Sequence, residues 1–164
     1  GKISLRKESI SLQEVLDFAV DASQIHIEAS SHQLVLDIQP EPIWLQADYA
    51  RIAQIVSNLL NNAAKYTPPG GEVRLSAKCI DDWVEIEVAD TGVGIPVDMQ
   101  AKIFDLFTQV NSSSGKVQDG LGIGLALVRQ LVELHDGAIS LIGSMPGQGS
   151  TFQVRLPVNN ASAG

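Results

Sequence analysis

The chain is poor in the features that mark secreted, membrane-embedded and nucleic-acid-binding proteins. Its single cysteine, Cys79, excludes an intrachain disulfide, fits a reducing compartment and is expected to be buried and inert. No apolar run reaches the roughly 20 residues that a membrane-spanning helix needs, and residues 1–10 lack the core of a signal peptide. Only 11 Lys and Arg stand against 19 Asp and Glu, for a net charge of −8. Nucleic acid is therefore not expected as a partner, because phosphate backbones are bound by basic surfaces.

The composition fits one globular domain. Hydrophobic residues make up 45% of the 164 residues and charged residues 18%, which allows a sizeable core and excludes wholesale disorder. We expect residues 1–10 to be the tail of a preceding region, residues 11–158 to form the domain, and residues 159–164 to be a flexible end. Because the chain begins without Met, we expect a piece of a longer protein. The domain is expected to be cytoplasmic and without direct membrane contact, while membrane anchoring of the parent protein stays open.

Apolar periodicity and turn residues predict the order of the elements. Residues 11–14 form a capping-box pattern that opens a first helix, and apolar residues from Ile52 to Ala63 define a second. A short helix near Asp98 and a last helix ending at Gly137 follow. Strands are expected at 34–38, 72–80, 83–89, 138–142 and 150–157. The mixture, mostly without βαβ alternation, predicts an α/β (α+β) two-layer sandwich with a mixed, mostly antiparallel sheet and about three helices on one face.

The second helix carries a polar stripe beside its apolar face. Asn58, Asn62 and Lys65 are spaced by four and three residues, and Asn61 adds another asparagine to the same turn. Asparagine is a mediocre helix former, so the stripe needs a reason. It is either a pocket wall, with amide oxygens for a metal and an ammonium group for phosphate, or an ordinary solvated flank.

A second pattern, Asp90-Thr-Gly-Val-Gly94, stands where the strand predicted at 83–89 ends. Gly92 and Gly94 permit backbone conformations and close ligand approaches that side chains would block. The Asp90 carboxylate can accept hydrogen bonds from a ligand amine. The alternative is an Asp-initiated turn with two conformational glycines.

A glycine cluster, Gly120, Gly122 and Gly124, followed by Leu125, opens the last helix. Unpaired N–H groups and the positive end of a helix dipole suit phosphate at such a start, and a flexible hinge is the alternative. The cluster is not the dinucleotide-binding G-x-G-x-x-G pattern. Lys116 belongs to no Walker A motif, because Val117 follows it.

Two aromatic residues and a polar stretch precede the glycine cluster. Phe104 and Phe107 stand three residues apart and are expected to be core anchors. Residues 108–119, rich in Ser, Asn and Gly, are expected to form a mobile loop, because loops of this length are uncommon unless functional or disordered. An anchor at one end would make this loop a lid.

In this order, Asn58–Thr67, Asp90–Gly94, Phe104–Phe107 and Gly120–Leu125 resemble the N, G1, F and G2 boxes of the catalytic ATP-binding domain of bacterial sensor or hybrid histidine kinases. Gly149-Ser-Thr151-Phe152 is similar to a further element of that family. The resemblance covers nearly the whole chain and implies the Bergerat (GHKL) ATP-binding fold. Leu106 departs from the pattern where the F box often has proline, and Asp119 departs where a small residue is common.

The resemblance implies roles for the site residues. Asn62 would give its amide oxygen to Mg²⁺, Lys65 would contact a phosphate, and Tyr66 would border the nucleotide. Asp90 would accept a hydrogen bond from the adenine amino group, whereas guanine presents a carbonyl there. Residues 108–119 would be the ATP lid, with Lys116 as a phosphate clamp. The other implied nucleotide-binding residues are Asn58, Gly92, Gly94, Ile95, Phe107, Gly120, Leu121, Gly122, Ile123, Gly124, Leu125 and Thr151.

The resemblance also implies ATP-dependent phosphoryl transfer, with Asn58 and Lys65 as catalytic residues. In the related gyrase and mismatch-repair ATPases an acidic residue at the position of Asn58 activates water, and an amide cannot act as that base. Transfer to a histidine is therefore favoured over hydrolysis. None of His26, His32 and His135 sits in the family's acceptor motif, and His135 is expected to be structural, at the end of the last helix.

The implied partners are the dimerisation and phosphoacceptor domain of the parent kinase and a response regulator or receiver domain. Two other functions remain open from the sequence. One is a serine kinase of the anti-sigma-factor type, which shares the fold, and the other is a non-catalytic nucleotide-sensing module.

Overall fold

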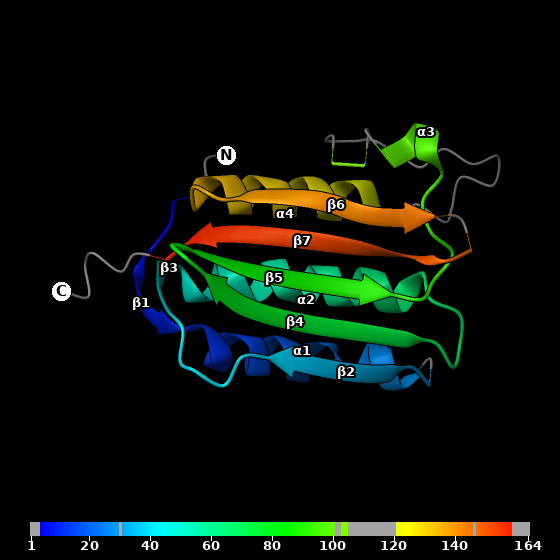
Figure 1. The fold of residues 1–164 in the computed structure, drawn as a ribbon, viewed down its shortest axis with the longest axis horizontal. Helices are drawn as coiled ribbons and strands as arrows, with labels where there is room; N and C mark the ends of the chain where they lie inside the picture. Colours follow the sequence, from blue (N-terminus) through cyan, green and yellow to red (C-terminus); the bar gives the residue numbers. More distant parts are fainter. Residues whose placement is uncertain (1–3, 30, 101–102, 105–120, 146, 159–164) are drawn as a thin grey trace.

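The fold is a two-layer sandwich in which helices cover one face of a five-stranded sheet (Figure 1). The computed structural model describes residues 4–29, 31–100, 103–104, 121–145 and 147–158, without the side chains of 121–124 and 145. The strand order is β2-β4-β5-β7-β6. The bounds are β2 (Gln33–Ile38), β4 (Glu72–Ile80), β5 (Trp83–Asp90), β6 (Ala138–Met145) and β7 (Gly149–Pro157). Only the β2–β4 pair is parallel in this sheet, which confirms the predicted fold class.

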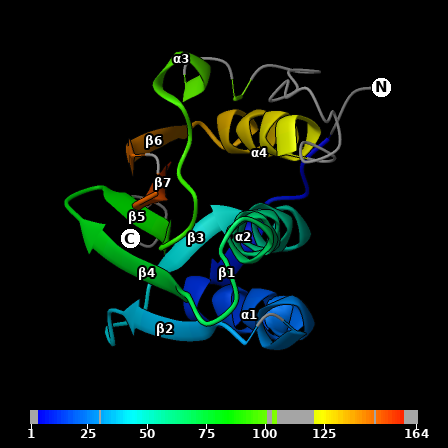
Figure 2. The ribbon, with the colours of Figure 1, turned by 90° about the vertical axis from the view of Figure 1, so that its right-hand side faces the viewer.

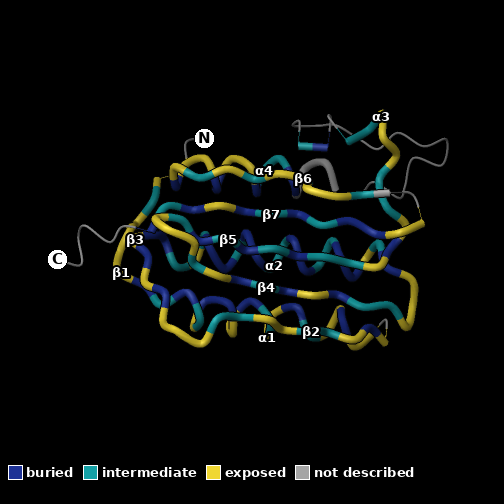
Figure 3. Tube along the Cα trace, viewed as in Figure 1, coloured by how far each residue is buried: buried dark blue, intermediate teal, exposed yellow. Residues whose placement is uncertain are grey.

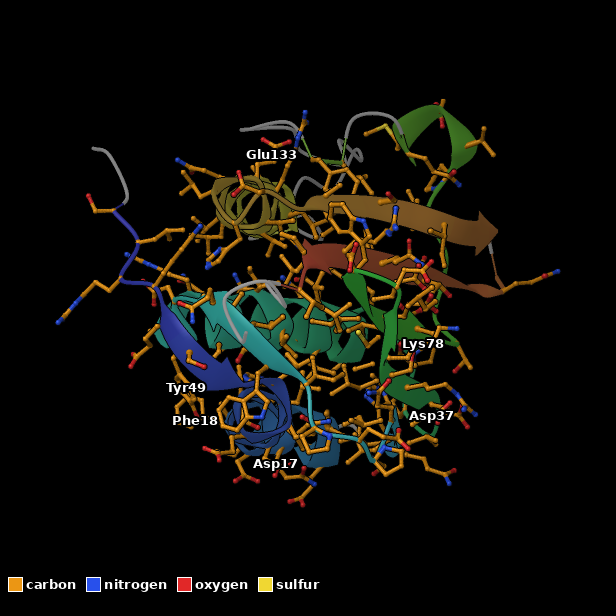
Figure 4. The ribbon with its side chains drawn as sticks, turned by 60° about the vertical axis from the view of Figure 1, so that its left-hand side comes forward. Asp17, Phe18, Asp37, Tyr49, Lys78 and Glu133 are labelled. Carbon is orange, nitrogen blue, oxygen red and sulfur yellow. The ribbon has the colours of Figure 1, made fainter. Side chains whose placement is uncertain are left out.

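The helices lie together on the inner face of this sheet. Figure 2 shows α2 (Tyr49–Lys65) between α1 (Leu12–Ala29) and α4 (Leu121–Leu134), with the short α3 (Val97–Gln100) apart from them. A small second sheet pairs β1 (Glu8–Ser11) antiparallel with β3 (Trp44–Ala47). In Figure 4 the rings of Phe18 on α1 and Tyr49 on α2 lie beside each other, with centroids 6.0 Å apart.

Alternation along the strands decides which residues face the helices. Successive strand residues point to opposite faces, so every second residue of β5 enters the core, as Val84, Ile86 and Val88 do. In Figure 3 the buried positions run as dark blue along the central strands. Asp37 and Lys78 are exposed and lie on the other, uncovered face of the sheet (Figure 4).

The central helix α2 is capped and strongly amphipathic. Asp48 is its N-cap residue, and the Asp48 Oδ1 atom accepts a hydrogen bond from the Arg51 N–H at 3.2 Å. The buried side chains are spaced along one face and comprise Ile52, Ala53, Ile55, Val56, Leu59, Leu60, Ala63 and Ala64. The asparagines of the polar stripe lie half-buried at the border of this face, which puts them at the edge of the core.

Asp48 also joins the N-terminal segment to the end of α4. Its Oδ2 accepts from the Arg6 N–H at 2.9 Å, and its own N–H donates to His135 Nε2 at 3.1 Å. The other ring nitrogen of His135, Nδ1, donates to the Leu131 carbonyl at 2.8 Å, so the imidazole is neutral with its proton on Nδ1. His135 is only 5% exposed, and its predicted structural role is confirmed.

Three features differ from the sequence-based expectation or add to it. The sequence does not predict β3, a short strand that closely follows Pro40 and Pro42. The expected boundary between residues 10 and 11 falls inside β1, whose Ile10 belongs to the core. The expectation of a buried Cys79 is wrong: the residue is half-buried, with Sγ 3.7 Å from the Asp81 carbonyl. No helix within the described residues is long and apolar enough to cross a membrane.

The cap at Asp48 predicts a pH-dependent contribution to stability. Burial alone raises the pKa of Asp48, but the N–H groups of Arg6 and Arg51 and the charge of Arg51 outweigh it and hold the pKa below its ordinary value. A carboxyl with a lowered pKa stabilises the fold at neutral pH, and this contribution is lost as the pH falls through its folded-state pKa.

Asp48→Ala is therefore expected to lower the free energy of unfolding by about 1–2 kcal/mol at neutral pH, and by less in acid. Urea denaturation at several pH values measures the difference. Asp37→Ala, which removes an exposed carboxylate from the uncovered sheet face, is the control. A penalty for Asp48→Ala that does not change with pH would show that the carboxylate charge plays no part.

Candidate functional site

The site forms around Asp90, the last residue of β5. Because Asp90 continues the alternation of Val84, Ile86 and Val88, it projects to the side of the sheet that the helices cover. Its backbone pairs with Ser150 of β7. A carboxylate thus lies at the end of the apolar row of β5, between the sheet and the helix layer.

The Asp90 carboxylate is partly desolvated and held by backbone donors. Its Oδ1 accepts from the Gly92 N–H at 2.8 Å. Burial raises the pKa of Asp90 above its ordinary value, and the N–H groups of Gly92 and Ser150 and the charge of His32 offset this only in part. A carboxyl group in these surroundings gains from a further hydrogen-bond donor supplied by a ligand.

The loop after Asp90 is in close contact with the end of α2. The Tyr66 carbonyl, directly after α2, accepts from the Val93 N–H at 3.2 Å. A Cβ atom on Gly92 would collide with the same carbonyl and lie 2.8 Å from Asp90 Oδ1, so only glycine allows this approach. The structure therefore brings the first two predicted motifs together through their backbones.

The rest of this loop is held by the β6–β7 hairpin. The Ile95 N–H donates to Ser144 Oγ at 2.8 Å, and Ser144 Oγ lies 2.8 Å from Ser150 Oγ. The Val93 carbonyl accepts from the Gly147 N–H at 2.7 Å. Gly94 has a positive φ of 76°, which fits the turn between these contacts. The motif is fixed on both sides, by α2 and by the hairpin.

The polar stripe of α2 runs toward this loop. Asn62 precedes the Tyr66 cap by one helical turn, and the Tyr66 N–H donates to the Asn62 carbonyl at 3.1 Å. The Asn62 Nδ2 atom is buried and has no hydrogen-bond partner among the described residues, so the fold leaves this donor nitrogen unsatisfied. Lys65 is exposed, with Nζ 5.5 Å from the centroid of the Tyr66 ring. Asn58 is half-buried one turn before Asn62.

The remaining predicted site residues divide into three groups. Leu125 is fully buried in the core, and Ile95 is partly buried against the same hydrophobic core. The backbone of Leu121, Gly122, Ile123 and Gly124 forms the first turn of α4, which confirms that the glycine cluster opens this helix. Phe107, Lys116, Gly120 and the predicted lid at 108–119 lie outside the described residues.

On β7, the structure places Ser150 rather than Thr151 on the side of Asp90. Ser150 and Phe152 are buried on the inner face, whereas Thr151 pairs with Ala89 and its side chain is directed to the other face. Thr151 still borders a hollow of about 150 Å³ together with Asp90. Phe104 meets Phe152 edge to face at 5.9 Å, as expected of a core anchor.

Sequence reasoning missed four polar residues that shape the site: Ser144, Ser150, Thr67 and His32. Ser150 could have been found from the sequence, because the alternation of inward and outward residues along β7 places it on the inner face. A bulge between Leu141 and Gly143 shifts the alternation of β6, so Ser144 had no such signal. Thr67 lies in the loop after α2 and His32 contacts the backbone of that loop, so both depend on tertiary contacts.

This fold and this arrangement of amides, glycines and a partly desolvated carboxylate are those of an ATP-binding domain. A family model described as histidine kinase-, DNA gyrase B-, and HSP90-like ATPase matches residues 47–160, which include Asn62 and Asp90. The chain belongs to this family.

Similar proteins lie in the histidine kinase branch of the family. The circadian input-output histidine kinase CikA of Thermosynechococcus vestitus is 40% identical over 96% of this chain, and the chain spans 22% of that protein's length. The mycobacterial sensor histidine kinase MprB superposes with a TM-score of 0.77 at 30% identity, covering 92% of this chain and 97% of that one. Full-length ShkA, solved in complex with AMPPNP, gives a TM-score of 0.80 at 32% identity, covering 96% of this chain and 32% of that one.

The environment of Asp90 predicts how ATP affinity depends on this side chain. Asp90→Asn is expected to weaken ATP binding by about 1–3 kcal/mol, the cost of disrupting a buried, charged hydrogen bond. Because burial raises the pKa of Asp90, the affinity of the parent should begin to fall, on acidification, at a higher pH than an ordinary aspartate would give.

Calorimetric titration with ATP over a pH series measures both effects. Asp37→Asn, on the uncovered face of the sheet, removes the same charge away from the site and serves as the control. If Asp90→Asn folds and binds ATP as tightly as the parent, Asp90 is a turn residue and the assignment is wrong.

Proposed function

We propose that this domain binds Mg-ATP and positions its γ-phosphate for transfer to a histidine on a separate dimerisation and phosphoacceptor domain. The observation that carries the proposal is the placement of Asp90, a carboxylate with a raised pKa whose loop contacts the end of an asparagine-rich helix. The similarity to histidine kinases supports transfer to protein rather than to water.

Base recognition is assigned to Asp90 and its loop. The carboxylate accepts from the 6-amino group of adenine, while guanine would present a carbonyl oxygen to it. Gly92, Gly94 and Ile95 give the purine close access to the backbone, and Tyr66 borders the nucleotide.

The residues present fit a hydrated Mg²⁺. The described residues hold no group of three or more His, Cys, Asp or Glu side chains that could hold a metal, so the ligands would be amide, water and phosphate oxygens. The side-chain oxygen of Asn62 would provide a neutral ligand of the kind that Mg²⁺ accepts beside phosphate, and its unpartnered Nδ2 atom would donate to the bound nucleotide or its water. When bound, the ion would neutralise phosphate charge.

The rest of the phosphate site is proposed around Lys65 and α4. The Lys65 ammonium group contacts a phosphate, and the N–H groups at the start of α4, from Gly120 to Gly124, receive the others. Asn58 has no acidic group to activate water. We also propose that residues 108–119, with Phe107 as anchor and Lys116 as clamp, close over the nucleotide.

None of the three histidines of the chain sits in the acceptor motif of the family. His135 is buried with both ring nitrogens in hydrogen bonds, and the His32 Nε2 atom is engaged with backbone carbonyls. His26 lies exposed in the last turns of α1. We therefore place the acceptor histidine on another domain of a cytoplasmic kinase, with a receiver domain or response regulator downstream.

The metal assignment predicts that Asn62→Ala weakens Mg-ATP binding much more than it weakens binding of metal-free ATP, because the lost ligand belongs to the metal. Calorimetry with excess Mg²⁺ and with a chelator separates the two. Gln54→Ala, an amide removed two turns earlier on α2, is the control. Equal losses in both conditions would contradict the assignment.

The acceptor assignment predicts that this domain binds ATP but does not label itself. Incubation with γ-labelled ATP should leave it unlabelled and most of the ATP intact, while the dimeric acceptor domain of the parent kinase, when added, takes up acid-labile label. Acid-stable label on an added protein would favour a serine kinase, and no transfer at all would favour a nucleotide sensor. Label on His135 would overturn the account of where the substrate lies.

A further inference from the structure

Thr67 is a buried residue that ends the segment resembling the N box, and neither the implied roles of that segment nor the proposed function includes it. It stands in the loop between α2 and β4 and is 4% exposed. Its methyl group faces Gly71, where an added Cβ would collide with it. Its hydroxyl faces the other way, because a Cβ on Gly92 would lie 3.1 Å from Thr67 Oγ1 and 2.8 Å from Asp90 Oδ1. The hydroxyl and the carboxylate thus flank the same glycine.

The backbone of Thr67 is held in place by His32. The His32 Nε2 atom lies 2.7 Å from the Thr67 carbonyl and 3.2 Å from the Pro68 carbonyl. Carbonyl oxygens only accept, so Nε2 carries the proton and donates to them. With the backbone fixed by His32 and the methyl group packed against Gly71, the hydroxyl keeps its direction toward Gly92.

The Thr67 hydroxyl has no hydrogen-bond partner among the described residues, although it is buried. A buried polar group without a partner destabilises a fold. Valine has the same shape and lacks this penalty, so packing alone does not explain a threonine here. The position next to Asp90 and Gly92 indicates that the missing partner is a ligand.

We propose that the Thr67 hydroxyl is a second base-reading group, which donates a hydrogen bond to a purine ring nitrogen flanking the amino group that Asp90 binds. This inference rests on the proposed function and adds a specificity-determining residue to it. The carboxylate accepts from the amino group and the hydroxyl donates to the neighbouring nitrogen. Together they match the donor–acceptor pattern of adenine.

The first test compares Thr67→Val with the parent for ATP, 1-deaza-ATP and 7-deaza-ATP, by calorimetry. Thr67→Val should bind ATP about 3- to 10-fold more weakly. The analogue that lacks the nitrogen bound by Thr67 should bind the parent protein more weakly than ATP does, by a similar factor. For that analogue, Thr67→Val should cause no further loss of affinity. Equal losses for all three nucleotides, or no loss for ATP, would overturn the proposal. Failure of the parent to bind ATP would instead overturn the proposed function.

The second test is the melting temperature of the nucleotide-free protein. If the hydroxyl serves the ligand, Thr67→Val should melt at or above the temperature of the parent, because an unsatisfied group is replaced by a methyl. A lower melting temperature would show that the hydroxyl serves the fold, against the proposal. Ser23→Ala is the matched control: Ser23 is a fully buried α1 residue whose hydroxyl also has no partner among the described residues. It should leave the affinity for all three nucleotides unchanged.

Discussion

The backbone contact between the end of α2 and the loop after β5 is the constraint on which the site depends. The Tyr66 carbonyl accepts from the Val93 N–H, and Gly92 comes so close to that carbonyl that a side chain would prevent it. The contact fixes the distance between the amides of α2 and the carboxylate of Asp90, which belong to different layers. Without it, the two motifs would be separate features of a helix and a hairpin.

Several polar groups at this end of the molecule are left incompletely satisfied by the fold. Asp90 has a raised pKa, and the Asn62 Nδ2 and Thr67 Oγ1 atoms are buried without partners among the described residues. Each is unfavourable in the free protein. The stability that tolerates them comes from elsewhere, chiefly from the apolar face of α2 against the sheet. Three such groups close together, in a fold that is otherwise consistent, are expected of a binding site.

Periodicity and turn chemistry were enough to predict most elements and the position of Asp90 at the end of a strand. They could not predict β3, which is short and exists through its pairing with β1. They also could not identify His32 or Thr67, since the role of each depends on contacts between segments distant in sequence. The resemblance pointed to Thr151, which stays a prediction, and the strand alternation of β7 adds Ser150 as the residue directed toward Asp90.

The contacts at the two ends of α2 serve different purposes. Those at its start stabilise the fold, and those at its end position the loop of the binding site. At its start, Asp48 caps the helix and bonds to Arg6 and His135, which ties the N-terminal segment to the last turn of α4. At its end, Tyr66 holds the loop of Asp90. Because α4 begins at the glycine cluster and His135 directly follows its last residue, the helix is fixed at the end opposite to the residues assigned to phosphate. The anchoring bonds therefore hold both helices without occupying any group that the nucleotide needs.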